Sequence, residues 1–185
     1  MILGLDLSSR EGSPSGYALL SLNKAIIDYG HFQVNSEIIS YVLIKKPDLI
    51  SIDAPLSLGE GGFRNCEKLL LKAGYKVFPT TIKWMKKLAL RGMFIANTLR
   101  KQGYRVIETH PTSSLRACGF KGNIKSKSTV ISFIKEKWGV EIPKNVSRHV
   151  VDAILAALAG YSYIMGEAII FRSDDGEIVL ASIKQ

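Results

Sequence analysis

The chain has 185 residues, 46% of them hydrophobic and 22% charged, with a formal net charge of +9. This length suits one domain with a core large enough to be stable alone, and the composition excludes disordered and collagen-like chains. Cys66 and Cys118 lie far apart without a nearby Cys or His partner, which argues against a zinc site and a disulfide framework. We therefore expect a cytoplasmic protein.

The N-terminal third predicts three strands, a helix and a fourth strand. Short apolar runs at residues 2–7, 16–22 and 25–34 are typical of a three-stranded meander. Ser36 is a good N-cap for a helix that ends near Lys46, because Pro47 cannot continue it. The apolar run at 48–54 is then a buried strand that ends in Asp53-Ala54-Pro55.

The rest of the chain alternates helices with strands. Residues 64–73 and 81–102 have helical periodicity and basic exposed positions, which predicts a mostly helical basic insertion over 59–104. The remaining predicted elements are a strand at 105–108 ended by Thr109-His110-Pro111, helices at 128–138 and 147–165, and a hairpin at 168–183 that turns at 174–176. A meander followed by such alternation predicts one α/β domain over residues 1–185, with a mixed five-stranded sheet flanked by helices.

Neither the first residues nor the most apolar later stretch of the chain suggests a membrane segment. The first residues have no positive region and no long apolar run, unlike a signal peptide. The apolar stretch at 150–170 contains Asp152 and Glu167, which favours a buried helix and turn. We expect no membrane association.

The positive charge is concentrated in the middle of the chain. Residues 61–148 contain 19 Lys and Arg against 4 Asp and Glu, a net charge of +15, whereas the segments on either side each carry −3. Such a block favours a polyanionic partner, since each neutralised phosphate releases counterions. Lysine-rich solvated helices that keep the protein soluble are the other interpretation.

Three aspartates carry the candidate chemistry. Asp6 and Asp53 each end an apolar strand, and neighbouring strands would bring their charges together at the carboxyl edge of the sheet. Asp152 lies five residues into the predicted helix after Ser147, too far to cap its free amides. His149 shares one helix face with Asp152, so both can face one ligand. Each aspartate alone could equally be a turn or capping residue.

Three carboxylates in one place require a cation. Oxygen ligands without a thiolate favour Mg²⁺ or Mn²⁺, and two such ions can stabilise the attacking and leaving oxygens of a phosphodiester displacement. The sequence therefore predicts a site with Asp6, Asp53 and Asp152 as metal ligands.

Four further residues are candidates near this site. Glu108 is either a fourth ligand or supporting partner, or a buried strand-end carboxylate paired with Arg64. Arg64 follows the Asp53 loop closely enough to contact substrate, although a simple ion pair with Glu67 one turn later also explains it. Lys125 and Lys127 are candidate phosphate contacts in a stretch that is by default a solvated loop.

These residues together carry a resemblance. The segments Gly4-Leu5-Asp6, Gly16-Tyr17-Ala18, Ile52-Asp53-Ala54-Pro55-Leu56, Arg64 with Glu67, Glu108-Thr109-His110-Pro111 and His149-Val150-Val151-Asp152-Ala153 resemble an uncharacterised family of predicted ribonuclease-H-fold nucleases. The last segment is also similar to the Holliday-junction resolvases of the ribonuclease-H superfamily. The resemblance implies that Asp6 bridges two metal ions and that Asp53 and Asp152 each hold one. Resolvases usually have Glu where Asp53 stands.

The expected function is hydrolysis of phosphodiester bonds in DNA or RNA, with His149 or a metal-bound water handling the proton. A homodimer would suit a junction resolvase. One alternative is a protein that has the ribonuclease-H fold and binds nucleic acid without cleaving it. Another is an actin-like ATP phosphotransferase, since Gly4-Leu5-Asp6-Leu7-Ser8-Ser9 resembles the first phosphate loop of sugar kinases. Those enzymes use two such domains, and 185 residues provide one.

Overall fold

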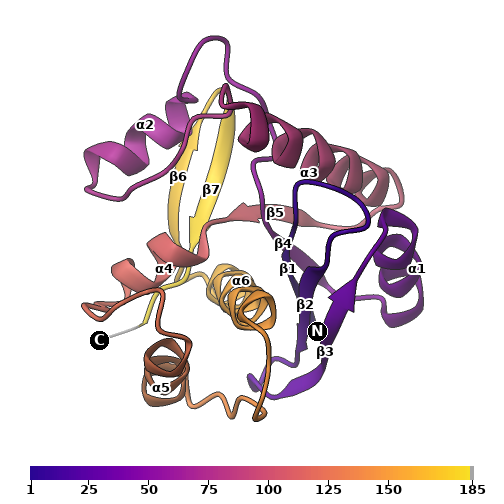
Figure 1. The fold of residues 1–185 in the computed structure, drawn as a ribbon, viewed down its shortest axis with the longest axis vertical. Coiled ribbons are helices and arrows are strands. Elements are labelled where there is room, and N and C mark those ends of the chain that lie inside the picture. Colours follow the sequence, from indigo (N-terminus) through magenta and orange to yellow (C-terminus); the bar gives the residue numbers. More distant parts are fainter. Residues whose placement is uncertain (184–185) are drawn as a thin grey trace.

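Seven strands form one mixed sheet in the computed structural model, which describes residues 1–183 (Figure 1). The strand order is β3-β2-β1-β4-β5-β7-β6. The strands are β1 Ile2–Asp6, β2 Ser15–Leu20, β3 Ile26–Phe32, β4 Leu49–Asp53, β5 Val106–Thr109, β6 Ile169–Ser173 and β7 Gly176–Leu180. Strands β1, β4, β5 and β7 run parallel, and β2, β3 and β6 run antiparallel to their neighbours. The last two residues of the expected 1–185 domain lie outside the described residues.

The C-terminal hairpin extends the predicted five-stranded sheet. Strand β7 pairs in parallel with β5 through Glu108 and Thr109, which adds β7 and β6 to one edge. The predicted hairpin and the mixed α/β sheet are thus both confirmed, and together they make seven strands. In Figure 1 the hairpin rises beside α2.

Six helices accompany the sheet: α1 Asn35–Lys45, α2 Asn65–Lys72, α3 Lys83–Lys101, α4 Pro111–Ala117, α5 Lys127–Trp138 and α6 Arg148–Ile164. Helix α4 was not predicted. His110 caps it, its side chain accepting a hydrogen bond from the Ser113 amide, and Pro111 occupies the first turn. Proline needs no hydrogen-bond partner for its nitrogen there, so a residue expected to end a strand also begins a helix.

Helix α1 begins differently from the prediction that Ser36 caps it. The cap residue is Val34, which has no side-chain acceptor. The Glu37 carboxylate instead accepts hydrogen bonds from the Gln33 amide at 2.6 Å and the Val34 amide at 3.3 Å. Since a carboxylate one turn into the helix satisfies these free amides, Ser36 is not needed as the cap.

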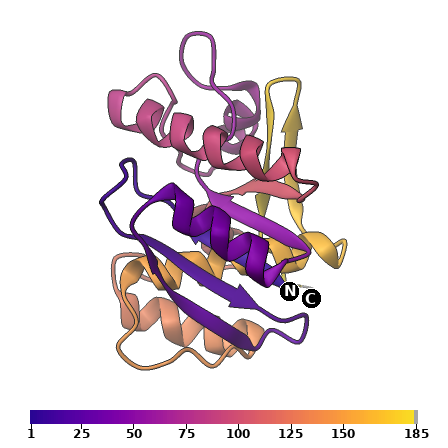
Figure 2. The ribbon, with the colours of Figure 1, turned by 90° about the vertical axis from the view of Figure 1, so that its right-hand side faces the viewer.

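The helices cover both faces of the sheet. Figure 2 shows α1 and α3 on one side of the meander and α5 and α6 on the other. Residues Ile95, Ala96 and Leu99 of α3 pack in one core with β1 and β4, so the segment predicted as an insertion contributes to the core. Helix α2 packs through Leu70 against the hairpin. No helix within residues 1–183 has the length and apolar character needed to cross a bilayer.

Two glycines allow α6 to lie unusually close to the sheet. A Cβ atom at Gly4 would lie 2.0 Å from the Ala153 carbonyl oxygen, and one at Gly16 would lie 2.2 Å from the His149 carbonyl oxygen. Neither contact is sterically possible, so only glycine at these strand positions permits this packing. The close approach places the first turns of α6 over the ends of β1 and β2.

Candidate active site

One row of residues crosses four neighbouring strands at the edge of the sheet. Asp6 pairs in register with Asp53 of β4 on one side and with Gly16 of β2 on the other, and Gly16 pairs with His31 of β3. The two aspartates end parallel strands, so their side chains leave the sheet at the same edge, as predicted. Gly16 leaves an open place in this row, and the backbone of His149 fills it.

The first turns of α6 bring two more site residues to this row. Ser147 caps the helix by accepting a hydrogen bond from the Val150 amide. The Nδ1 atom of His149 lies 2.6 Å from Oδ2 of Asp6. Arg148 donates from Nε to Oδ2 of Asp152 at 2.7 Å. The expected acids and His149 therefore meet at one edge, from β1, β4 and α6.

The carboxylates influence one another electrostatically. Burial raises the pKa of Asp53 well above its usual range, and the neighbouring acids Asp6, Asp152 and Glu108 raise it further. Burial also raises the pKa of Asp152, against the lowering effect of the Arg148 hydrogen bond and charge. The hydrogen bond to Asp6 raises the pKa of His149, against the effect of burial. The site thus favours added positive charge, either as protons or as a cation.

The residues fit a hard metal ion in chemistry and charge. The Oδ1 atom of Asp152 is buried and has no hydrogen-bond partner among residues 1–183. Buried oxygens of this kind normally have a partner, and a cation would supply one. Within the same residues, however, no three His, Cys, Asp or Glu side chains form a ready-made ligand set. Arg148 contacts only Oδ2 of Asp152, and His149 contacts only Oδ2 of Asp6, so a metal ion at these acids would either share them with Arg148 and His149 or replace those contacts.

Glu108 and Arg64 form a buried network behind Asp53. Arg64 is 1% exposed, and its guanidinium binds Glu67 and both oxygens of Glu108. The Leu56 amide also donates to Glu108 at 2.7 Å. Burial raises the pKa of Glu108, and its contacts with Arg64 and Leu56 oppose the rise. Arg64 thus faces inward, and the network ties the loop after Asp53 to β5.

The two candidate lysines lie near α6 in different settings. Lys125 is exposed on a loop and borders a shallow hollow with Ile124 and Arg148. Lys127 donates from Nζ to the Val146 carbonyl at 2.7 Å, so its ammonium holds the chain that leads into α6.

The sequence did not identify His31 as a neighbour of the site. Its Nε2 atom lies 2.7 Å from the Ser147 hydroxyl, and its ring meets that of His149 edge-on with centroids 6.5 Å apart. The signal that could have found it is the β2–β3 pairing. That register shifts by a bulge between Leu19 and Leu20, which sequence does not reveal.

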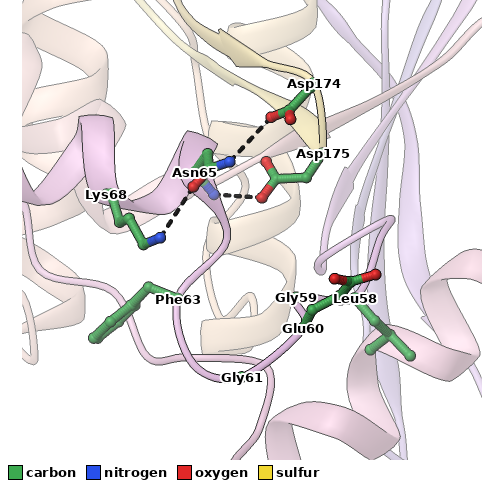
Figure 3. Close-up of a pocket in the computed structure, with 9 residues that line it drawn as sticks. All are labelled: Leu58, Gly59, Glu60, Gly61, Phe63, Asn65, Lys68, Asp174 and Asp175. Carbon is green, nitrogen blue, oxygen red and sulfur yellow. Dashed lines mark hydrogen bonds between the residues drawn. The ribbon is translucent and has the colours of Figure 1, made fainter.

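Two of the cavities beside the loop that follows β4 are lined by acidic residues. One of about 200 Å³ has Asp53 in its wall and therefore adjoins the acids. The other, of about 380 Å³, lies between the loop at residues 58–61, the start of α2 and the hairpin turn (Figure 3). In it Asp175 accepts hydrogen bonds from the Asn65 and Cys66 amides, and Asp174 accepts one from the Asn65 side chain. Those acids cap α2 and lie in a separate place from the candidate site.

Comparison with known proteins identifies the fold. The chain is similar to RuvC from T. thermophilus in complex with a Holliday junction substrate, with 15% identity and a TM-score of 0.52 over 90% of this chain and 96% of that chain. It is equally similar to a second structure of Thermus thermophilus RuvC, with 12% identity, the same coverage and the same TM-score. At such identities the likeness establishes a shared fold, and it confirms the predicted ribonuclease-H-like architecture.

Sequence comparison places the chain in a family. No curated protein matches it. A family model described as "Protein of unknown function (DUF429)" matches residues 4–176, which is most of the chain. The predicted membership of an uncharacterised family with a resolvase-like fold is therefore confirmed, and the chain belongs to the DUF429 family of proteins of unknown function.

Proposed function

We propose that this protein is a divalent-metal-dependent nuclease that hydrolyses phosphodiester bonds in DNA or RNA. The observation that carries the proposal is the meeting of Asp6, Asp53 and Asp152 at one edge of the sheet. The charges of Asp6 and Asp152 raise the pKa of Asp53, and the charge of Asp6 also raises the pKa of Asp152. The protein is basic apart from this acidic cluster. Basic residues would bind the phosphates of a polyanionic substrate, and the acids would hold the metal ions beside it. The similar RuvC structure, in complex with a Holliday junction, supports nucleic acid as the partner.

In this proposal Asp6, Asp53 and Asp152 hold Mg²⁺ or Mn²⁺. Two such ions, when bound, would supply charge stabilisation to the attacking and leaving oxygens of an in-line displacement. His149 is half exposed. It would handle a proton at Nδ1 once a metal ion has replaced it as the partner of Asp6. Arg148 would be released from Asp152 in the same way and become free to meet a phosphate.

The remaining candidates have supporting roles. Glu108 would act as a positioning residue, because it holds Arg64 and the Leu56 amide and so fixes the loop after Asp53. Arg64 would act through the same network, since it is buried away from solvent. Lys125 would contact backbone phosphate, and Lys127 would keep the segment before α6 in place. A homodimer would present two acidic sites to a branched substrate.

The test is the substitution Asp6→Asn. We expect it to lower Mn²⁺ binding, measured by isothermal titration calorimetry, and the rate of cleavage of labelled junction, single-stranded and duplex substrates by at least about 100-fold. The fold should remain, since the change removes one charge from a crowded group of carboxylates. A suitable control is Asp48→Asn at the opposite end of β4, where the exposed carboxylate pairs with the N-terminal amine. Cleavage at the wild-type rate by Asp6→Asn would remove Asp6 from the mechanism.

One observation favours a second function, nucleic-acid binding without cleavage. Arg148 already neutralises Asp152, and the described residues contain no assembled ligand set. Under this alternative the wild-type protein would bind nucleic acid and cleave no substrate, and substitution of all three aspartates would leave the affinity unchanged.

A further inference from the structure

The cavity beside Asp53 has a largely apolar wall. Its volume is about 200 Å³, and it lies between the ends of β4 and β5 and the start of α3. Its larger apolar side chains are Val77, Phe78, Trp84, Met85, Leu88 and Ile178. A concave apolar site beside a few polar groups is the usual form of a ligand-binding pocket.

Two aromatic rings at this cavity are exposed. Phe78 is 59% exposed and Trp84 is 48% exposed. Their ring centroids lie 5.5 Å apart with the planes at 66°, so the rings form two walls of one corner. Exposed aromatic rings beside a positive surface are a common means of stacking nucleobases.

Positive charge lies beside one of these rings. Trp84 also borders a second hollow with Ser9, Arg10, Lys83 and Lys87. Trp84 therefore borders both a largely apolar cavity and a hollow lined by cations. Between residues 61 and 107 the single acidic residue is Glu67, which is buried against Arg64. The cavity is also lined by Asp53 and by Glu108, which is paired with Arg64, so the positive charge lies at the outer hollow. A ligand that combines an apolar planar group with a neighbouring negative charge, as a nucleotide does, suits this arrangement.

We propose that this cavity receives an unpaired nucleobase, with the neighbouring phosphates on Arg10, Lys83 and Lys87. The inference rests on the proposed nuclease function, and it specifies the substrate as a strand with at least one unstacked base next to the acidic site. His110 lines the cavity too, and its Nδ1 atom accepts from the Ser113 amide at 3.3 Å. The ring hydrogen is then on Nε2, which suits a base oxygen as acceptor. Fully paired duplex offers no base to this cavity.

The test compares two single strands of equal charge in EDTA, where no cleavage occurs. One is a fluorescein-labelled 12-residue oligothymidylate, and the other is a matched 12-residue abasic strand. We expect the wild-type protein to bind oligothymidylate about tenfold more tightly than the abasic strand, as stacking of one base on an aromatic ring predicts. Trp84→Ala and, separately, Phe78→Ala should remove most of this preference while leaving the affinity for the abasic strand unchanged.

Two control variants separate stacking from charge and from general damage. Phe94→Ala removes another ring of α3 that is 55% exposed and lies outside the cavity, so it should keep the preference. Lys87→Gln should lower the affinity for both strands by the same factor. Equal wild-type affinity for the two strands, or an unchanged preference in both Trp84→Ala and Phe78→Ala, would overturn the proposal.

The outcome is independent of the nuclease test. A base preference without cleavage of any substrate would keep the base site and reject the nuclease. Cleavage that depends on Asp6, without any base preference in EDTA, would keep the nuclease and reject the base site.

Discussion

Asp53 differs from the other two aspartates in its immediate partners. Asp6 has His149 beside it, and Asp152 has Arg148. For Asp53 burial and three neighbouring carboxylates all raise the pKa, and none of its described neighbours lowers it. A group in this position either keeps a proton or binds a cation. Asp53 is therefore the residue on which the metal proposal depends most.

His110 provides a prediction at the residue scale. Burial lowers the pKa of His110 to about 4 from an ordinary value of 6.5. Between these values the unfolded chain binds a proton that the folded chain excludes, so stability falls as the pH is lowered from about 6.5 to about 4. The full loss from this residue is about 3 kcal/mol. His110→Asn should keep the helix cap and lose this part of the pH dependence.

The measurement is urea unfolding of both proteins at pH 7, 6, 5 and 4. Carboxyl groups titrate in both, so the difference between the two curves isolates His110. As the pH falls, the unfolding free energy of the wild type should decrease more than that of His110→Asn. Parallel curves would mean that the pKa of His110 is the same in the folded and the unfolded chain.

At the scale of elements, the packing of α6 on the meander decides whether the site exists. Gly16→Ala should force the first turn of α6 away from β2, because the new Cβ would collide with the His149 carbonyl. Overpacking of this kind typically costs about 1–3 kcal/mol. We expect a lower unfolding midpoint in urea and weaker Mn²⁺ binding by calorimetry.

The matched control is Gly30→Ala on β3. There a Cβ would lie 3.0 Å from the ring of Tyr17, away from α6. This variant should keep Mn²⁺ binding even if it loses some stability. Equal Mn²⁺ affinity in Gly16→Ala and wild type would show that the position of α6 does not control the site.

At the scale of the whole molecule, acidic and basic residues are concentrated in different segments of the chain. The acids meet at the sheet edge, whereas residues 61–148, which include helices α2, α3, α4 and α5, carry a net charge of +15. Affinity for single-stranded oligothymidylate in EDTA should therefore depend steeply on salt. If about four phosphates are neutralised, affinity falls about fiftyfold between 50 and 200 mM salt. Fluorescence anisotropy at four salt concentrations gives the slope, and a flat response would contradict electrostatic binding.

The sequence by itself determined the segments, the fold class and the candidate acids. Strand and helix periods are local properties, so the meander, the strand that ends in Asp53, the helix after Ser147 and the hairpin could all be predicted. Local sequence patterns failed to predict the starts of two helices, where a residue distant in sequence or an unusual cap stabilises the first turn. Glu11 and Glu37 accept hydrogen bonds from backbone amides at the start of α1, where Ser36 was expected to be the cap. Pro111 begins α4, although it was expected only to end a strand.

Only the tertiary structure decided which groups meet. The row from Asp53 through Asp6 and Gly16 to His31 depends on strand register, including a bulge in β2–β3 that no local pattern encodes. The ion pair of Arg148 with Asp152 and the cavity beside Trp84 depend on side-chain conformation and on packing between distant segments. Sequence period reports which way a residue faces within its own element, whereas contacts across elements are set by register and close packing of the assembled fold.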